Sequence, residues 1–289
     1  MRTAASNLLA LGAIALWATL ATLSVSLSHV PPFLLTGLAL IVGGLIALPL
    51  SRFDWRAWKV PPRTLALGVY GLFGYHFLLF IALRHAPPVQ ANLVNYLWPL
   101  GIVLMSPLFL PGTQLQSRHW IAALLGFAGA ALAITGGNPA AALQGGLAWG
   151  YLPALGAAFM WSSYSLMTQR VAPFPTAAIG SFALVSGAAS LLCHAWLEPA
   201  VALSARDLLL IGLLGLGPLG AAFYLWDAAL KRGDARRIGV LSFATPVLST
   251  LLLLWWRGDA PSPAIALAAG LIVAAAVIVR PTRTTDAQA

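Results

Sequence analysis

Charged side chains are scarce in this sequence: they make up 8% of its 289 residues, and only seven of the residues are acidic. An average soluble domain has about 25% charged residues, so this chain lacks the polar surface that a soluble fold of its size needs. Sixty per cent of the residues are hydrophobic, and the mean hydropathy is +0.87. These values indicate a polytopic membrane protein.

Reactive groups are equally sparse. A single cysteine, Cys193, cannot form an intramolecular disulfide, and its apolar surroundings predict a packed thiol. We find no paired intramembrane carboxylates, no HExxH or GxSxG motif and no Walker A loop, so we expect no enzyme activity, cofactor or metal. The net charge of +9 comes from Lys and Arg that punctuate apolar segments, a pattern that excludes nucleic acid as the expected partner.

Long apolar runs fill most of the chain. A helix needs about twenty apolar residues to cross the hydrocarbon layer, and the polar breaks leave segments at 7–27, 31–50, 64–84, 88–109, 117–136, 146–168, 175–197, 207–230, 236–256 and 262–280. The sequence therefore predicts an all-α polytopic protein with ten transmembrane helices in one membrane domain, residues 1–289. The first segment lacks a cleavage-site pattern, so we interpret it as a spanning helix.

Basic residues are distributed unevenly between the two sides that ten spans define. One side holds thirteen of the sixteen Lys and Arg residues, including Arg280 and Arg283, and the other side holds only Arg84, Arg206 and Arg257. Because cytoplasmic loops are enriched in Lys and Arg, we expect both termini in the cytoplasm.

The tryptophans divide into two groups. Eight lie in loops or near predicted span ends, as interfacial aromatic residues do: Trp55, Trp58, Trp120, Trp149, Trp196, Trp226, Trp255 and Trp256. Trp17, Trp98 and Trp161 lie deeper, and Trp98 is about ten residues, or roughly 15 Å, into its span. Interfacial anchoring does not explain these three.

The sequence also repeats itself. LGAIALW at 11–17 matches LGAAFMW at 155–161 and IAALLG at 121–126 matches IALAAG at 265–270, both at an offset of 144, while FIALRHA at 80–86 matches DAALKRG at 227–233 at an offset of 147. The unit contains five helices, an odd number, so the second copy must cross the membrane in the opposite sense. We expect two inverted-topology five-helix repeats, residues 1–140 and 141–289, which is the architecture of many secondary transporters.

Polar residues inside spans indicate where a site lies. In the fourth span, Asn92, Asn95, Tyr96 and Pro99 have the spacing of one helix face, and Trp98 lies about 60° round from Asn95. Helix packing can explain isolated polar residues in a membrane, but for this cluster we favour the wall of a cavity. Pro99 and Pro246 are superimposed by the 147-residue offset, which makes them candidate hinges.

Other spans add candidate lining residues: Trp17, Tyr75, His76, Trp161, Tyr164 and Tyr224. His76 is open to two interpretations, a hydrogen-bonded structural residue or a contact for substrate or protons. Asp227 lies close to the end of its span, where an i,i+4 pair with Lys231 explains it more simply than proton coupling does.

A deep site with neutral polar and aromatic groups suits a small molecule whose own charges cancel, such as a zwitterionic amino acid with an apolar or aromatic side chain. Two alternatives make different predictions. An exporter of cationic drugs or sugar-linked metabolites calls for an acidic mid-membrane residue or a basic cavity. A membrane-embedded enzyme, such as a lipid head-group transferase, calls for clustered His, Asp or Glu near one interface, which the sequence lacks.

The motifs ALWAT at 15–19, ALRHA at 82–86, NYLWP at 95–99 and AFMWSSYSL at 158–166, set in ten spans, resemble the EamA-type drug/metabolite transporter superfamily. NYLWPL together with YHFLLFIAL at 75–83 is most similar to its YddG-type aromatic amino acid exporters. The resemblance implies an exporter of aromatic and other neutral amino acids in the bacterial inner membrane, and we expect the protein to be a monomer. Its cavity between the halves would open alternately to each side, lined by Trp17, Tyr75, His76, Asn95, Tyr96, Trp98, Pro99 and Trp161. Thr245 stands where the repeat would place Trp98, so we expect a lopsided cavity.

Overall fold

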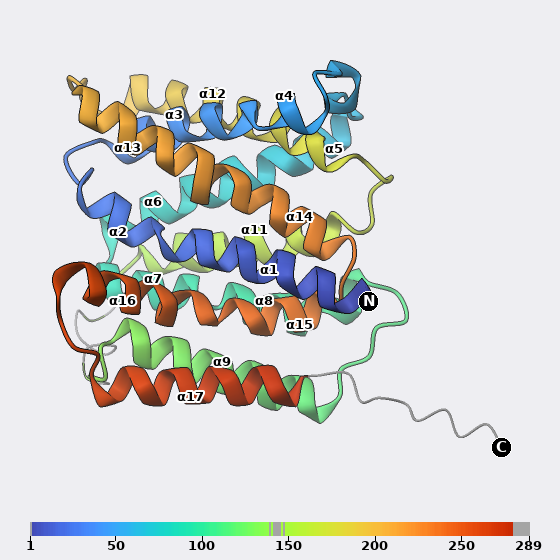
Figure 1. Ribbon diagram of the computed structural model, residues 1–289, viewed down its shortest axis with the longest axis vertical. Helices are drawn as coiled ribbons and strands as arrows, with labels where there is room; N and C mark the ends of the chain where they lie inside the picture. Colours follow the sequence, from blue (N-terminus) through green and yellow to red (C-terminus); the bar gives the residue numbers. More distant parts are fainter. Residues whose placement is uncertain (1, 139, 141–145, 147, 280–289) are drawn as a thin grey trace.

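The computed structural model describes residues 2–138, 140, 146 and 148–279, and in that part of the chain the secondary structure is helical throughout, without a strand (Figure 1). Most predicted spans consist of two or three helical pieces. The first half contains α1 (Arg2–Ala18), α2 (Leu20–Val25), α3 (Pro32–Leu45), α4 (Ala47–Leu50), η1 (Trp55–Trp58), α5 (Pro62–Val69), η2 (Tyr70–Gly74), α6 (Tyr75–His85), α7 (Pro88–Asn95), α8 (Trp98–Phe109) and α9 (Ser117–Ile134). The second half contains α11 (Tyr151–Met167), η3 (Thr176–Ala178), α12 (Ile179–Leu197), α13 (Ala205–Leu216), η4 (Gly217–Ala221), α14 (Ala222–Leu230), α15 (Ala235–Ser242), α16 (Ala244–Arg257) and α17 (Pro263–Ile278).

Eight helical stretches among the described residues are long and apolar enough to cross a membrane: Ala4–Val25, Pro32–Leu50, Pro62–His85, Pro88–Phe109, Ser117–Ile134, Thr176–Leu197, Ala205–Leu230 and Ala235–Arg257. The other two predicted spans are the shorter helices α11, with 17 residues, and α17, with 16. An all-helical multi-pass membrane protein is therefore confirmed, while the count of ten spans stays a prediction. The expected boundary between residues 140 and 141 falls where the described part of the chain is interrupted. Arg280 and Arg283 lie outside the described residues.

The outer surface is apolar, as a lipid-facing surface must be. Several leucines within helices are between 65% and 77% exposed: Leu8, Leu108, Leu152 and Leu192. In water such exposure would be unfavourable by about 25 cal/mol per Å² of apolar surface. In a bilayer the same side chains face a medium as apolar as themselves.

The main helix contacts join one half of the chain to the other. Helix α3 packs against α12, α9 against α17, α1 against α14, and α6 against α11. Small residues allow α3 and α12 to approach closely: a methyl group added at Gly187 would lie 2.9 Å from the carbonyl oxygen of Gly37. Close approach through small side chains is how helices associate in membranes.

Two irregular turns recur at the sequence offset of 147 residues. The π turns η2 and η4 begin at Tyr70 and Gly217, and 217 − 70 = 147. The helix breaks that separate α7 from α8 and α15 from α16 include Tyr96 and Phe243, and 243 − 96 = 147. Pro99 and Pro246 each follow a break within the first turn of a new helix, where the missing N–H group leaves no hydrogen bond unmade.

Candidate functional site: a cavity between the two halves

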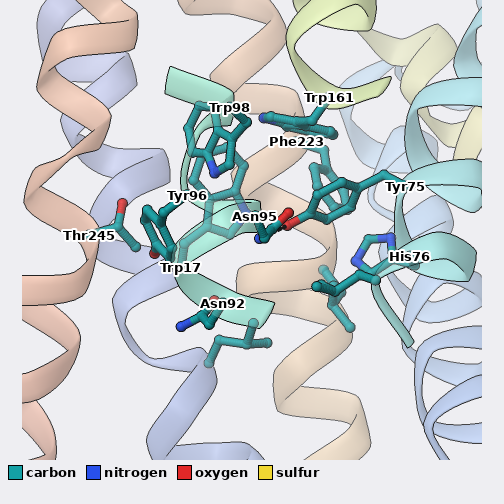
Figure 2. Close-up of a pocket in the computed structure, with 13 residues that line it drawn as sticks. Trp17, Tyr75, His76, Asn92, Asn95, Tyr96, Trp98, Trp161, Phe223 and Thr245 are labelled. Carbon is teal, nitrogen blue, oxygen red and sulfur yellow. Dashed lines mark hydrogen bonds between the residues drawn. The ribbon is translucent and has the colours of Figure 1, made fainter. Parts of the chain in front are cut away.

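A cavity of about 160 Å³ lies among helices of both halves (Figure 2). Its walls are formed by Trp17, Leu20, Tyr75, His76, Leu79, Asn92, Asn95, Tyr96, Trp98, Trp161, Leu219, Phe223 and Thr245. In the first half, Tyr75 and His76 follow directly on η2, and Asn95 directly precedes the break before α8. In the second half, Leu219 belongs to η4 and Thr245 follows the break before α16. The irregular backbone therefore lies beside the cavity, a placement typical of π turns at functional sites.

An aromatic cluster of Trp17, Trp98, Trp161, Phe223 and Trp226 forms one end of the site. The indole of Trp17 meets those of Trp98 and Trp161 edge to face, with ring centroids 6.3 and 5.8 Å apart. Trp226 lies behind the wall, 5.2 Å from Trp17 and only 1% exposed. Edge-to-face contacts contribute about 0.5–1.5 kcal/mol each beyond area burial. These contacts hold the rings of the cluster in a fixed arrangement, so the cluster forms a rigid apolar surface.

Polar groups occupy the other part of the wall. Asn95 donates from Nδ2 to the hydroxyl of Tyr75 at 3.1 Å, the bond drawn in Figure 2. The amide Oδ1 of Asn95 and the hydroxyl of Thr245 have no hydrogen-bond partner, although the two residues are only 3% and 6% exposed. An unpartnered buried polar atom costs about 1–3 kcal/mol. Both atoms could therefore accept a hydrogen bond from water or from a polar ligand.

His76 makes a hydrogen bond within the fold and also lines the cavity. Its Nδ1 lies 2.6 Å from the carbonyl oxygen of Leu72, a residue of η2, and donates a hydrogen bond there. This bond fixes the ring and leaves Nε2 as the acceptor nitrogen. The ring also lines the cavity, so the structural bond sets its orientation at the site.

No Asp, Glu, Lys or Arg is among the residues that line the cavity. Asp227 pairs instead with Lys231 four residues later, with Nζ 2.7 Å from Oδ2, which confirms the expected i,i+4 pair. Thr176 donates a second hydrogen bond to the same oxygen at 2.7 Å. Lys231 also bonds the carbonyl of Phe174 at 2.8 Å. This pair stabilises the end of α14, away from the cavity wall.

The structure brings eight of the ten expected lining residues to the cavity: Trp17, Tyr75, His76, Asn92, Asn95, Tyr96, Trp98 and Trp161. Tyr164 and Tyr224 lie elsewhere. The ring of Tyr164 covers Gly71, where an added methyl group would lie 2.3 Å from the ring. The hydroxyl of Tyr224 donates to the carbonyls of Gly43 and Gly44 in α3 at 3.0 and 3.2 Å. The ring of Tyr164 and the hydroxyl of Tyr224 are thus used in packing the helices.

Several residues were missed or misplaced by sequence reasoning. Leu20, Leu79, Leu219 and Phe223 line the cavity but carry no polar signal. The interfacial assignment of Trp226 was wrong, because α1 and α11 cover it in the aromatic cluster. The repeat offset would have found two of these positions: adding 147 takes His76 to Phe223 and Leu79 to Trp226.

An all-helical membrane domain with one shared cavity between two halves is the architecture of a small-molecule transporter. The EamA-like transporter family model matches residues 4–135 and again residues 148–280, so the chain belongs to this family and contains two copies of its unit.

The sequence is 43% identical to the aromatic amino acid exporter YddG of Ancylobacter novellus over 96% of this chain and 98% of that protein. It is 27% identical to the exporter of the same name from Escherichia coli K12, over 86% and 87% of the two chains. A solved crystal structure with 44% identity superimposes with a TM-score of 0.89 over 96% of both chains. These comparisons confirm the family resemblance and agree with the expectation that the chain is not an enzyme.

Proposed function

We propose that the chain is a secondary transporter that exports aromatic and other neutral amino acids across the bacterial cytoplasmic membrane, acting as a monomer. The observation that carries the proposal is the cavity wall, where indole and phenyl rings face neutral hydrogen-bonding groups and charged side chains are absent. The relatives in Ancylobacter novellus and Escherichia coli are named aromatic amino acid exporters, which supports the aromatic part of this substrate class.

The size and chemistry of the cavity favour a small zwitterion over a drug. Pockets for drug-sized ligands measure about 300–1,000 Å³, and this cavity measures about 160 Å³. A cationic substrate would need a carboxylate in the wall. Asp227 could have supplied this carboxylate, but it is not among the lining residues. Its carboxylate accepts hydrogen bonds from Lys231 and Thr176 instead.

Alternating access between inverted repeats is supported by the way the halves pack. In the repeat, α1 is equivalent to α11 and α6 to α14, so the contact of α1 with α14 is equivalent to the contact of α11 with α6. Helix α3 packs against its own equivalent, α12, and α9 packs against its own equivalent, α17. This exchange pattern is what a two-fold axis between the halves produces. In Figure 1, α1 and α11 run in opposite directions across the view, as do α3 and α12.

Hinges at Pro99 and Pro246 fit this mechanism, since both prolines lie in the first turn of a helix that follows an equivalent break. The distribution of Lys and Arg, thirteen on one side and three on the other, supports ten spans with both termini in the cytoplasm. In Figure 1 the start of α1 and the end of α17 lie on the same side of the molecule, which agrees with an even number of spans.

Proteoliposomes provide the test. Purified protein would be reconstituted and assayed for uptake of labelled phenylalanine, tryptophan, threonine and methionine, each with and without an imposed pH gradient. We expect saturable uptake of the aromatic substrates. Absence of saturable uptake for all four amino acids would sink the amino-acid assignment, and stimulation by the gradient would reveal proton coupling.

A further inference from the structure

We propose that the hydrogen-bonded pair of Asn95 and Tyr75 binds both charged groups of the transported amino acid. In this arrangement the free amide oxygen of Asn95 accepts from the substrate's ammonium group, and the hydroxyl of Tyr75 donates to its carboxylate. The inference rests on the proposed function and adds the orientation of the substrate: the amino acid backbone lies at the pair, and its side chain extends toward the aromatic cluster.

The hydrogen-bond inventory of the pair supports this assignment. The Tyr75 hydroxyl accepts the bond from Asn95 Nδ2 at 3.1 Å, so its own proton is directed elsewhere. The Oδ1 of Asn95 is buried without a partner. One acceptor and one donor are therefore left side by side. Exchanging the two ends of the amide would reverse which residue accepts, but the pair would still present one donor and one acceptor.

A zwitterion needs this combination in an uncharged cavity. The lining residues include no charged side chain, so a lone cation or anion would be desolvated without a counter-charge. In a zwitterion the two charges are close enough to offset each other, and hydrogen bonds to charged groups are roughly twice as strong as neutral ones. The pair offers such bonds to both groups at once.

The position of the pair sets where the side chain goes. The ring of Tyr75 lies 5.4 Å from the indole of Trp161, centroid to centroid. Figure 2 shows Asn95 and Tyr75 in the middle of the cavity, with Trp98 and Trp161 on one side of them. A substrate held at the pair can therefore stack its side chain on the indoles. Thr245 lies apart from the pair, beyond Tyr96.

Substrate analogues and variants together test the pair. Ligand affinity would be measured by intrinsic tryptophan fluorescence on the full-length protein, since the indoles lie in the cavity wall. The ligands are phenylalanine, phenylalaninamide, which has no carboxylate, and 3-phenylpropionate, which has no ammonium group. The variants are Tyr75→Phe and Asn95→Leu, with Tyr151→Phe as the matched control because the Tyr151 hydroxyl bonds the Gly146 carbonyl at an exposed site outside the cavity.

We expect the unsubstituted protein to bind phenylalanine at least tenfold more tightly than either analogue. Tyr75→Phe should weaken phenylalanine binding about tenfold and weaken phenylalaninamide binding less, because the neutral amide oxygen of that ligand accepts a weaker hydrogen bond than a carboxylate does. Asn95→Leu should weaken phenylalanine and phenylalaninamide and leave 3-phenylpropionate unchanged. Tyr151→Phe should alter none of the three affinities.

Equal affinity of the unsubstituted protein for phenylalanine and both analogues would overturn the inference, and this comparison does not depend on any variant folding. An equal loss of phenylalanine and phenylalaninamide binding in a folded Tyr75→Phe protein would also overturn it. In both cases phenylalanine still binds, so the proposed function survives. Absence of phenylalanine binding and uptake in the unsubstituted protein would overturn the proposed function and the inference together.

Discussion

Trp17 donates its indole N–H to the carbonyl oxygen of Pro218 at 3.1 Å, across 201 residues of sequence. Pro218 belongs to the π turn η4, whose irregular backbone leaves a carbonyl free for a side chain. In the first half the corresponding turn, η2, offers the carbonyl of Leu72 to His76. The π turn of each half therefore accepts a hydrogen bond that orients a side chain of the cavity wall.

Replacing Trp17 by Phe should separate this bond from ring packing. The variant keeps an aromatic ring but leaves the Pro218 carbonyl without its donor, so we expect a loss of about 1–2 kcal/mol in the free energy of unfolding and slower transport. Titration with a denaturing detergent and uptake assays would measure the two effects. Trp196→Phe, at an 86% exposed position, is the control. Equal stability of the two variants would show that the bond contributes nothing.

Trp98→Ala should reduce amino acid uptake at least tenfold while the protein still reaches the membrane. Trp98 is 5% exposed and contacts Trp17, Trp161 and Trp226, so truncation removes both a wall of the cavity and several aromatic contacts. Because such truncations cost about 3–5 kcal/mol, the melting temperature must be measured alongside uptake. Trp98→Phe should retain more uptake than Trp98→Ala. Unchanged uptake in the alanine variant would assign Trp98 to packing alone.

The helices and most of the site could be predicted from sequence because both depend on local patterns. Apolar length determines a spanning helix whatever surrounds it. Spacing along one helix placed Asn92, Asn95 and Tyr96 on a common face, and all three line the cavity. The repeat offset carried information about the backbone as well, since both π turns obey it.

The remainder depends on packing between helices, which no single span specifies. Trp226 lies four residues from the end of α14, which suggested an interfacial position, but α1 and α11 bury it. The hydroxyl of Tyr224 was expected to contact the substrate, but it donates hydrogen bonds to backbone carbonyls of α3 instead. Such assignments follow only from knowing which helices are neighbours.

Asp227→Asn should destabilise the protein although it preserves the shape of the side chain. The Asp227 carboxylate is 1% exposed and Lys231 is 27% exposed, so removing one charge leaves a partly buried cation without its partner. We expect a loss of about 2 kcal/mol, below the usual 3–5 kcal/mol for a fully buried pair because water screens Lys231.

The double variant Asp227→Asn/Lys231→Met should recover part of this loss, because no unpaired charge remains. Asp234→Asn is the control, since Asp234 is 41% exposed, pairs with Arg236 and caps α15, and asparagine also caps helices. Its loss should stay below about 1 kcal/mol. A single Asp227→Asn variant as stable as this control would show that the pair is dispensable. Uptake with and without a pH gradient, measured on Asp227→Asn, would reveal whether the carboxylate also serves in coupling.

Two glycines within long helices should respond in opposite ways to alanine. In an exposed helix interior, Gly→Ala stabilises by about 1 kcal/mol because alanine has the higher helix propensity. Gly212 in α13 has open space around the position of a new methyl group, so Gly212→Ala should be neutral or stabilising.

At Gly187 in α12 the methyl group would lie 2.9 Å from the backbone oxygen of Gly37 and 3.1 Å from Ile41. The backbone of α3 cannot yield as a flexible side chain can, so Gly187→Ala should force α3 and α12 apart and lower stability by about 1–3 kcal/mol. Thermal unfolding of both variants in the same detergent measures the difference, and equal stability would mean that the contact between α3 and α12 tolerates a wider spacing.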